Sequence, residues 1–502
     1  MTGESIFLSG HLPTCPDRFN AAEWCLSADI PGSAEAFLAV DPEAGVVERW
    51  SFEDLRARVL RAAGALQAAG VQPGDPVVLL LGDVPAFPIA YFGVIAAGGV
   101  ATPLSSQLSE DEVARIIETV KPRVVLGGSR ATMPAEALED GPAIGFVPRE
   151  RNDPALLVFT SGSSGRPKGV LHAQRAFWAR QSMHVGWHGI RAGDRVIHAG
   201  AFNWTFTLGV GLADTWSVGA TAILNAGRRD PDVWPDLARA FDPTVFAAAP
   251  AVYRRLLKYG RDLRTGFASL RHAVTAGEAL SPAIAESWTR ATGKPLLEAL
   301  GMSEVSTYVS TPPGRKPQPG IAGWPQPGRQ VAVLGADGRP VPFGAPGVLS
   351  VHRSDPGLML GYWADPIMTE AAYAGDWFQT GDRVSMTEDG AITYLGRQDD
   401  QMNAQGYRVD PGEVEAALTS CTGVHECAVR ALEIKDGLSV IAAWVVEDPG
   451  VDLSSEELTK ALEPKLASYK RPRAFFRVDE LPRTGNGKLL RRGLQARDAD
   501  RI

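Results

Sequence analysis

The sequence contains the run Phe159-Thr160-Ser161-Gly162-Ser163-Ser164-Gly165-Arg166-Pro167-Lys168-Gly169, directly after the apolar residues 155–158. The apolar residues predict a buried strand. Seven of the eleven residues in the run are Ser, Thr or Gly, so backbone N–H groups and hydroxyls can approach phosphate oxygens without side-chain bulk. Lys168 adds a mobile positive charge. The spacing is not that of a Walker loop, and a short Ser/Gly run taken alone favours a flexible turn over a phosphate loop.

Four further segments follow in order over the rest of the chain, and they resemble one family together with the Ser/Gly run. They are Leu300-Gly301-Met302-Ser303-Glu304, Trp377-Phe378-Gln379-Thr380-Gly381-Asp382, the stretch from Gly396-Arg397-Gln398-Asp399-Asp400 through Gly406-Tyr407-Arg408-Val409 to Glu415, and Pro482-Arg483-Thr484-Gly485-Asn486-Gly487-Lys488. Met359-x-Gly361-Tyr362-Trp363 lies among them. The set resembles the motifs of the adenylate-forming superfamily, which includes acyl-CoA synthetases, adenylation domains and luciferases. Because composition does not produce five co-linear motifs, the chain is identified as a member.

The hydrophobic pattern predicts an α/β fold class. Helical spacing at 52–69, 86–97 and 282–292 alternates with short buried strands at 76–81, 123–126, 245–248, 273–275 and 296–298, which favours helix-covered parallel sheets. From Gly328, short strands at 331–334, 348–352 and 392–394 predict a small β subdomain. A compact α+β unit should follow, with helices at 411–420 and 455–466 and strands at 426–432 and 439–446. We expect a large N-terminal domain at 1–398 and a small mobile C-terminal domain at 399–502, a boundary that rests partly on the resemblance.

Composition excludes several classes of protein. The 502 residues are 45% hydrophobic and carry a net charge of −8, which argues against a nucleic-acid surface. Residues 460–492 hold ten Lys or Arg against three acids, which suits a polyanionic small ligand or, equally, a solvated basic face. The uncharged stretch 84–100 is interrupted by Pro and Gly, so it predicts a buried helix and not a membrane span. With no signal peptide evident and no Cys-x-x-Cys pair, we expect a cytoplasmic protein with free buried thiols.

The resemblance implies a reaction in two halves. In this superfamily a carboxylate attacks the α-phosphorus of ATP, releases pyrophosphate and forms an acyl-adenylate, after which a thiol, usually that of coenzyme A, displaces AMP. The first half brings one anion toward another, so it needs cations and oriented donors more than a base. The resemblance therefore implies an ATP-dependent carboxylic acid–CoA ligase that uses ATP, Mg²⁺ and coenzyme A.

The resemblance also assigns the phosphate and metal contacts. Glu304 resembles the Mg²⁺ ligand, and one carboxylate with phosphates and water is sufficient for this hard cation. Ser303 keeps the hydroxyl that the family more often draws from Thr. The β- and γ-phosphates should be held by the Ser/Gly run, namely Thr160, Ser161, Gly162, Ser163, Ser164 and Gly165, with Lys168 nearby.

The nucleoside contacts are expected from two other motifs. Asp382 resembles the ribose anchor, because a carboxylate can accept hydrogen bonds from both vicinal hydroxyls, and Arg397 resembles the arginine that reaches the ribose or the α-phosphate. Each could instead be an ordinary turn or surface residue. The adenine should lie against Gly277, Glu278, Ala279, Ala299, Leu300, Gly301 and Met302. Leu300 replaces the usual aromatic residue, so base stacking there should be weaker.

The C-terminal domain should supply the catalytic lysine and the thiol-binding strand. Lys488 resembles the lysine that bridges the acyl carboxylate and the α-phosphate, and Asp399 resembles the pivot for domain rotation. After rotation, residues 404–408, including Gly406 and Arg408, should take the place of Lys488 beside the coenzyme A. The lysine loop also resembles a protein acetyltransferase target, which implies an acetyltransferase and a deacetylase as partners; a Lys488 that is catalytic and never modified is equally open. A homodimer is a further possibility.

The acyl substrate is the least determined part of the site. Residues 201–207 should form its wall through Phe202, Trp204 and Phe206, opposite Ala276, Gly277 and Gly301, although these aromatic side chains could equally be core. The wall lacks the Asp that amino-acid-activating domains use, which suggests a small to medium aryl or short acyl acid, as in benzoate-type ligases. A free-standing adenylation enzyme that loads an acyl carrier protein is the alternative. A luciferase-like oxidation or a non-catalytic AMP-binding regulator fits less well.

Overall fold

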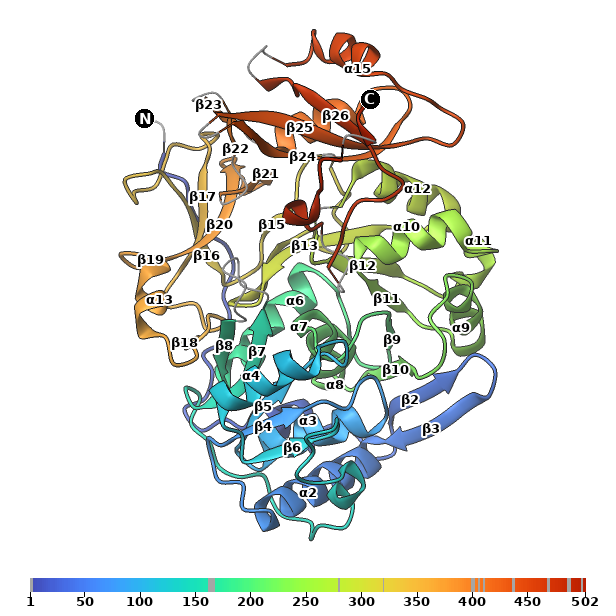
Figure 1. Ribbon diagram of the computed structural model, residues 1–502. Coiled ribbons are helices and arrows are strands. Elements are labelled where there is room, and N and C mark those ends of the chain that lie inside the picture. The colour runs from blue at the N-terminus through green and yellow to red at the C-terminus, as the bar shows by residue number, and fades with distance from the viewer. Residues whose placement is uncertain are drawn as a thin grey trace.

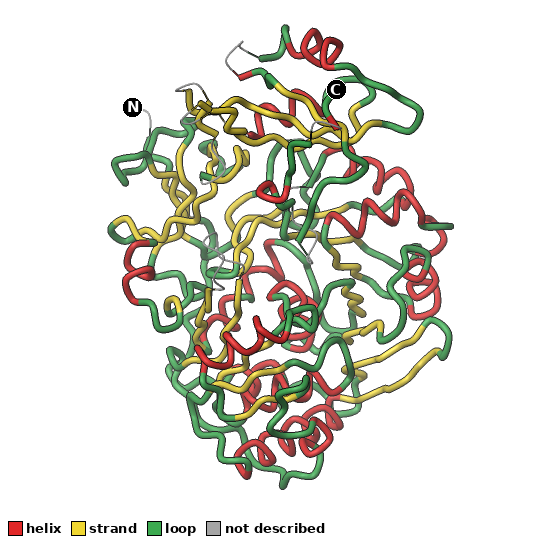
Figure 2. The backbone as a smooth tube through the Cα atoms, in the orientation of Figure 1, coloured by secondary structure: helices red, strands yellow, loops and turns green. Residues whose placement is uncertain are grey.

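The computed structural model describes residues 3–502 except 161–167, 279, 319, 399–401, 405–406, 410, 436–437, 467–469, 485–488 and 498–499. Figure 1 shows a large body that holds most of the chain, with the last part of the chain, in red, above it. Figure 2 shows that helices and strands alternate through the large body, whereas strands dominate beside and above it. The predicted α/β fold class is therefore confirmed.

The largest sheet has nine described strands and carries much of the site. Its order is β15-β14-β13-β12-β11-β9-β10-β2-β3, parallel from β13 to β2 and antiparallel at both ends. The bounds are β2 (Glu35–Asp41), β3 (Gly45–Ser51), β9 (Arg195–His198), β10 (Thr221–Asn225), β11 (Val245–Ala248), β12 (His272–Ala276), β13 (Leu296–Met302), β14 (Ser306–Ser310) and β15 (Trp324–Pro325). β13 runs four residues beyond the strand expected at 296–298, because Leu300, Gly301 and Met302 pair with β14 across a bulge.

A second sheet has six described strands in the order β18-β8-β7-β5-β4-β6. The bounds are β4 (Pro76–Leu79), β5 (Val100–Pro103), β6 (Val124–Leu126), β7 (Pro154–Thr160), β8 (Lys168–Ala173) and β18 (Gly361–Tyr362). β4, β5, β6 and β7 are parallel, whereas β7 and β8 are antiparallel neighbours. The Ser/Gly run therefore joins two antiparallel strands and does not open a helix.

Helices cover both faces of these sheets. In the large body they are α1 (Ala21–Cys25), α2 (Phe52–Ala68), α3 (Ala86–Ala96), α4 (Glu110–Val120), η1 (Ala135–Leu138), α5 (Arg175–Ala179), α6 (Gln181–Gly186), α7 (Thr205–Leu208), η2 (Gly209–Ala213), α8 (Asp214–Trp216), α9 (Val233–Phe241), α10 (Pro250–Tyr259), α11 (Leu263–Gly266) and α12 (Pro282–Thr292). A capping box between Ser51 and Asp54 begins α2, and it satisfies backbone donors at the helix start. α3, in the uncharged stretch 84–100, is buried on nearly every side, as its composition predicted.

The remaining strands form the β subdomain and the C-terminal part. β1 (Ile6–Leu8), β16 (Gln330–Leu334), β17 (Gly347–His352), β19 (Tyr373–Ala374), β20 (Trp377–Met386) and β21 (Ile392–Arg397) make the small sheet, with α13 (Pro366–Ala371) beside it. Beyond it lie β22 (Met402–Ala404), β23 (Tyr407–Val409), α14 (Pro411–Thr419), β24 (Val424–Lys435), β25 (Leu438–Glu447), α15 (Ser455–Leu462), β26 (Ala474–Arg477) and η4 (Arg491–Gly493). Strands β24 and β25 pack with α14 and α15 around their own hydrophobic cluster.

All four cysteines, Cys15, Cys25, Cys421 and Cys427, are buried and unpaired, as predicted. Among the described residues, every helix is too short or too polar to cross a bilayer.

Candidate nucleotide and acyl-binding site

Strands β7 and β8 hold the ends of the expected phosphate loop. Thr160 and Lys168 are directly paired across the two strands, so the loop leaves and returns at neighbouring positions. Lys168 Nζ lies 5.6 Å from the centroid of the Tyr362 ring. The expected contacts Ser161, Gly162, Ser163, Ser164 and Gly165 lie outside the described residues.

Tyr362 connects this hairpin to the expected metal ligand. The short strand β18 pairs with β8, and its Tyr362 hydroxyl donates to Glu304 Oε1 at 2.9 Å. The Met359 N–H donates to the Glu304 carbonyl oxygen at 2.8 Å. Burial, and then the neighbouring Glu304 carboxylate, raise the pKa of Tyr362, so the phenol stays protonated and remains a donor.

Glu304 fits the role of a magnesium ligand. Its carboxylate lies in the turn between β13 and β14, and Tyr362 occupies only one of its two oxygens among the hydrogen bonds of the described residues. A carboxylate accepts up to four hydrogen bonds or ligand contacts, so oxygen lone pairs remain for a hard cation. Nearby phosphates and water would supply the other ligands.

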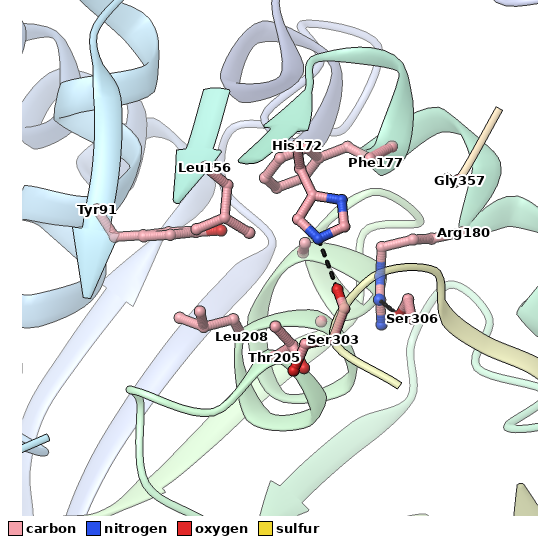
Figure 3. Close-up of a pocket in the computed structure, with 13 residues that line it drawn as sticks. Tyr91, Leu156, His172, Phe177, Arg180, Thr205, Leu208, Ser303, Ser306 and Gly357 are labelled. Carbon is pink, nitrogen blue, oxygen red and sulfur yellow. Dashed lines mark hydrogen bonds between the residues drawn. The ribbon is translucent and has the colours of Figure 1, made fainter. Parts of the chain in front are cut away.

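Two buried side chains, His172 and Arg180, donate hydrogen bonds to the turn that carries Glu304. His172 Nε2, on β8, donates to the Ser303 carbonyl oxygen at 2.7 Å, and Arg180 Nη1 donates to Ser306 Oγ. Figure 3 shows both contacts at the edge of a cavity of about 40 Å³, which Tyr91, Leu156 and Leu208 also line. Burial lowers the pKa of His172 to about 4, so this imidazole is neutral at physiological pH.

Arg180 is itself fixed by Asp214. Arg180 Nε and Nη2 donate to the two carboxylate oxygens of Asp214 at 2.6 and 2.7 Å, and His188 Nε2 lies 3.3 Å from one of them. The neighbouring guanidinium holds the pKa of Asp214 well below its usual range, against the effect of burial. Ser306 has φ = 68°, a left-handed conformation that is costly for residues other than glycine. The Arg180–Ser306 hydrogen bond therefore fastens a strained residue two positions after Glu304.

The expected ribose contacts lie side by side on two strands. Asp382 on β20 is paired in register with Arg397 on β21, and Arg397 Nη1 donates to Asp382 Oδ1 at 3.0 Å and to the Thr380 carbonyl oxygen at 2.7 Å. Asp382 is only 4% exposed. The positive charge of Arg397 opposes the rise in the pKa of Tyr362 that burial and Glu304 cause.

The expected adenine segment begins at the end of β12. Gly277 has φ = 101°, and a Cβ atom built there would lie 2.6 Å from the Trp204 indole ring, so only glycine fits. The buried Glu278 Oε1 has no hydrogen-bond partner among the described residues, and such an acceptor suits the amino group of adenine. Ala279 lies outside the described residues, whereas the Leu280 N–H donates to Glu298 Oε1 at 2.8 Å.

The other side of the expected adenine slot comes from β13. Ala299 is buried, and Leu300 and Met302 are partly buried against the main core. Gly301 faces the backbone of β14, since a Cβ atom there would lie 2.6 Å from the Ser306 carbonyl oxygen. These residues lie on the strand that leads into the Glu304 turn, so one strand carries both the expected adenine slot and the expected metal ligand.

The C-terminal part reaches this segment through Arg483. Arg483 Nη1 donates to Glu278 Oε2 at 3.2 Å, while Arg483 Nη2 pairs with Glu426 on β24. Lys488, Asp399 and Gly406 lie outside the described residues, and the Arg408 backbone lies on β23 with its side chain likewise outside them. Arg483, a residue of the motif that ends at Lys488, thus contacts the large body at Glu278.

The three aromatic residues of the expected acyl wall differ in their surroundings. Trp204 is partly exposed and contacts Gly277, whereas Phe206 is 5% exposed and packs against Trp187. Phe202 is 4% exposed and stacks on Phe87 with ring centroids 4.9 Å apart. Ala276 is buried at the end of β12. Trp204 is therefore the aromatic side chain that the structure brings to the nucleotide segment, and Phe202 and Phe206 lie in the core.

Sequence reasoning missed the residues that hold the site together. It named Tyr362 only as part of a motif, and it gave no role to His172, Arg180 or Asp214. Each of these acts on a residue far away in the chain, so local pattern carries no sign of the contact. The available signal was that Arg180 and Asp214 each lie among mostly apolar residues. A charge that is buried needs a partner, so such positions indicate an ion pair.

Comparisons with known proteins agree with this geometry. The sequence model for the AMP-binding enzyme matches residues 31–363, and that for the AMP-binding enzyme C-terminal domain matches residues 413–488. The 3-hydroxybenzoate–CoA ligase of Aromatoleum sp. (strain CIB) is 30% identical, and the match covers 88% of this chain and 90% of that protein.

Two solved structures are similar throughout. ATP-bound MatB from Rhodopseudomonas palustris superposes with a TM-score of 0.88 at 26% identity, over 94% of this chain and 97% of that one. The anthranilate CoA ligase AuaEII in complex with anthranoyl-AMP gives a TM-score of 0.83 at 27% identity, over 95% and 96%. The enzyme class predicted from the sequence, an AMP-forming acid–thiol ligase, is the class of these relatives. The chain belongs to the AMP-binding enzyme family.

Proposed function

We propose that this enzyme joins a small aromatic carboxylic acid to coenzyme A through an acyl-adenylate, with release of pyrophosphate and then AMP. The observation that supports it best is the contact of Tyr362 with both Lys168 and Glu304, together with the Asp382–Arg397 pair on β20 and β21. A phosphate-binding cation, a hydrogen-bonded carboxylate and a buried acceptor for a diol are the groups that a bound ATP requires.

In the first half-reaction the acid's carboxylate oxygen attacks the α-phosphorus, and the bond from that phosphorus to pyrophosphate breaks. Lys168 and Thr160 would hold the outer phosphates, and Asp382 with Arg397 would hold the ribose. Mg²⁺ at Glu304 would supply positive charge to the phosphate oxygens. Tyr362 keeps the Glu304 carboxylate oriented, and we assign to Lys488 the neutralisation of charge between the reacting carboxylate and the α-phosphate.

In the second half-reaction the coenzyme A sulfur attacks the acyl carbon and AMP leaves. We propose that residues 1–398 and 399–502 form two domains and that Asp399 is the pivot between them. Rotation would withdraw Lys488 and bring the strand with Gly406 and Arg408 to the acyl group. The separate hydrophobic clusters of the two parts support such a division.

The aromatic class of acid rests on two supports. Trp204, partly exposed against Gly277, offers a flat apolar surface next to the nucleotide segment, and aromatic rings pack well on one another. The relatives include a 3-hydroxybenzoate–CoA ligase and a structure that contains anthranoyl-AMP. Both of those acids are small benzoic acids.

A screen of carboxylic acids tests this function. The purified enzyme is given Mg-ATP, coenzyme A and one acid at a time, from acetate through benzoates to long-chain acids, with pyrophosphate release and the acyl-CoA product measured by mass spectrometry. We expect substituted benzoates to give the highest kcat/KM. Exclusive turnover of aliphatic acids would contradict the aromatic assignment, and transfer to a phosphopantetheinylated carrier protein but not to coenzyme A would favour the alternative enzyme.

We also propose that acetylation of Lys488 switches off acid activation, because it removes the positive charge needed in the first half-reaction. Stoichiometric acetylation by an acetyltransferase should abolish pyrophosphate release, and a deacetylase should restore it. Full activity of the acetylated protein would exclude both this regulation and the role of Lys488. A cytoplasmic location and a homodimer stay predictions from the sequence.

A further inference from the structure

Two buried polar side chains at the expected acyl wall have no hydrogen-bond partner among the described residues. They are His198, at the end of β9, and Thr207, on α7, which are 6% and 1% exposed. His198 Nε2 and Thr207 Oγ1 both lack a partner within the described part of the chain. A buried donor or acceptor without a partner destabilises the folded protein, so an unpaired group in a native site calls for an explanation such as a ligand.

The hydrogen-bonding state of His198 follows from its other nitrogen. The Gly200 N–H donates to His198 Nδ1 at 2.8 Å, so Nδ1 is the acceptor and Nε2 carries the proton of the neutral ring. Burial lowers the pKa of His198 to about 3, and the ring is therefore uncharged at working pH. Nε2 presents an N–H donor for which the described part of the chain offers no acceptor.

The hydroxyl of Thr207 is free for a different reason. A threonine inside a helix commonly donates to the carbonyl oxygen three or four residues earlier. Thr207 follows Trp204 by three positions on the short helix α7, and its Oγ1 makes no such bond. The hydroxyl can therefore both donate to and accept from a ligand.

His198 and Thr207 border the same point beside Gly200. A Cβ atom built on Gly200 would lie 2.4 Å from Thr207 Oγ1 and 2.7 Å from the Cε1 atom of His198, between its two ring nitrogens. His198 also lies edge-on to the Trp204 ring, with centroids 6.4 Å apart. The other side of α7, with Thr205 and Leu208, faces the cavity under Ser303 and Ser306 (Figure 3). The pair is thus adjacent to Trp204 and separate from that cavity.

We propose that His198 and Thr207 form a polar subsite that binds a hydroxyl group on the ring of the aromatic acid, and that they select hydroxylated over unsubstituted or methylated benzoates. This proposal rests on the proposed function, since it assumes an aromatic acid against Trp204. The ring hydroxyl accepts from His198 Nε2–H and donates to Thr207 Oγ1, which satisfies both protein groups at once. An acid without the hydroxyl would leave both unpaired, and sites of this kind reject such analogues strongly.

The test compares matched acids in matched variants. Acyl-CoA formation is measured for benzoate, for the 2-, 3- and 4-hydroxybenzoates and for the 2-, 3- and 4-methylbenzoates, which fill similar space without the hydrogen bonds. We expect the wild-type enzyme to prefer one hydroxybenzoate over its methyl counterpart by about tenfold or more in kcat/KM. Thr207→Val should lower kcat/KM for that hydroxybenzoate by about 10- to 100-fold and leave the methylbenzoate within about threefold.

Two further variants keep the test decisive. Thr207→Ser retains the hydroxyl and should preserve the preference, and His198→Phe should lose it while keeping a ring of similar shape. Equal losses with hydroxy- and methylbenzoates in Thr207→Val, or no wild-type preference for any hydroxybenzoate, would overturn the proposal and leave a water molecule as the partner of both groups. Failure of every benzoate to form an acyl-CoA would instead contradict the proposed function itself.

Discussion

Arg483 Nη1 donates to Glu278 Oε2 at 3.2 Å, and Arg254 Nη2 lies 3.5 Å from the same oxygen. Arg483 belongs to the motif that ends at Lys488, and Glu278 follows the glycine on which Trp204 packs. This ion pair therefore joins the C-terminal part to the nucleotide segment.

Arg483→Gln should slow adenylation selectively. Both partners are partly exposed, so the pair is worth about 1 kcal/mol, and we expect a roughly fivefold lower rate of pyrophosphate release. Thioester formation from synthetic acyl-adenylate and coenzyme A should be unchanged or faster, because the alternative domain orientation no longer competes with this contact. The exposed Arg473→Gln serves as the control. Equal slowing of both half-reactions would show that Arg483 does not favour one orientation.

Lys488→Ala should abolish acid activation and spare the second step. Removing a charge that acts mainly in the transition state is expected to lower the adenylation rate by about three orders of magnitude. Single-turnover assays with ATP and acid, and separately with acyl-adenylate and coenzyme A, measure the two steps. The exposed Lys460→Ala variant should behave as the wild type. A comparable loss in both assays would contradict the rotation of the C-terminal domain.

Asp382→Asn should weaken the binding of ATP and AMP to the same extent. The loss of a charge-assisted hydrogen bond to the ribose corresponds to about 1–3 kcal/mol, or roughly 10- to 100-fold in Kd. Calorimetric titration with each nucleotide gives the affinities, and Asp389→Asn, at an exposed ion pair, is the matched control. Unchanged affinity for both nucleotides would show that Asp382 does not bind the ribose.

The hydrogen bond from Arg180 to Ser306 should set the magnesium requirement. Ser306→Ala and Ser306→Gly both remove the acceptor, but glycine tolerates φ = 68° without strain. We expect both variants to need about three- to tenfold more Mg²⁺ for half-maximal activity, since the Glu304 turn is no longer fastened. Ser306→Gly should keep the wild-type melting temperature. An unchanged Mg²⁺ dependence in both would mean that the contact only stabilises the fold.

Glu298 should make the protein less stable as the pH rises. Burial raises the pKa of this carboxyl to about 8 from an ordinary value near 4.5. Between these two values the unfolded chain releases the proton while the folded chain keeps it, so the free energy of unfolding falls with increasing pH. Glu298→Gln keeps an acceptor for the Leu280 N–H and should be more stable than the wild type at pH 8.5, where the buried carboxyl of the wild type ionises. Urea unfolding at pH 5 and pH 8.5 measures the difference, with exposed Glu286→Gln as the control. Parallel pH profiles for all three proteins would exclude the effect.

The sequence predicted the regular elements well where local chemistry marks their ends. The helix Pro282–Thr292 has the expected bounds, because proline occupies its first turn and Gly293, with φ = 76°, ends it. The end of β13 was not predictable in this way. Residues 300–302 hold no strand-like alternation, and their pairing with β14 is decided by a neighbouring strand.

The same distinction between local and long-range information applies to the candidate site. Glu304, Asp382 and Arg397 could be named from short motifs, because each motif keeps its order in the chain. The contacts among them could not, since Tyr362, His172 and Arg180 reach their partners across 58, 131 and 126 residues. For Trp204 the sequence left pocket and core equally open, and only the closeness of its ring to Gly277 favours the pocket.

The pairing of β18 with β8 joins segments that lie far apart in the chain, and the orientation of Glu304 depends on it. The residues of β7, β8 and the Glu304 turn are synthesised before Tyr362. The Glu304 carboxylate therefore gains its Tyr362 donor only after β18 has been made and has paired with β8. Contacts between distant segments form slowly, because the loop between them must close first. In refolding from urea, catalytic activity should therefore return after the helical signal, together with the last long-range packing.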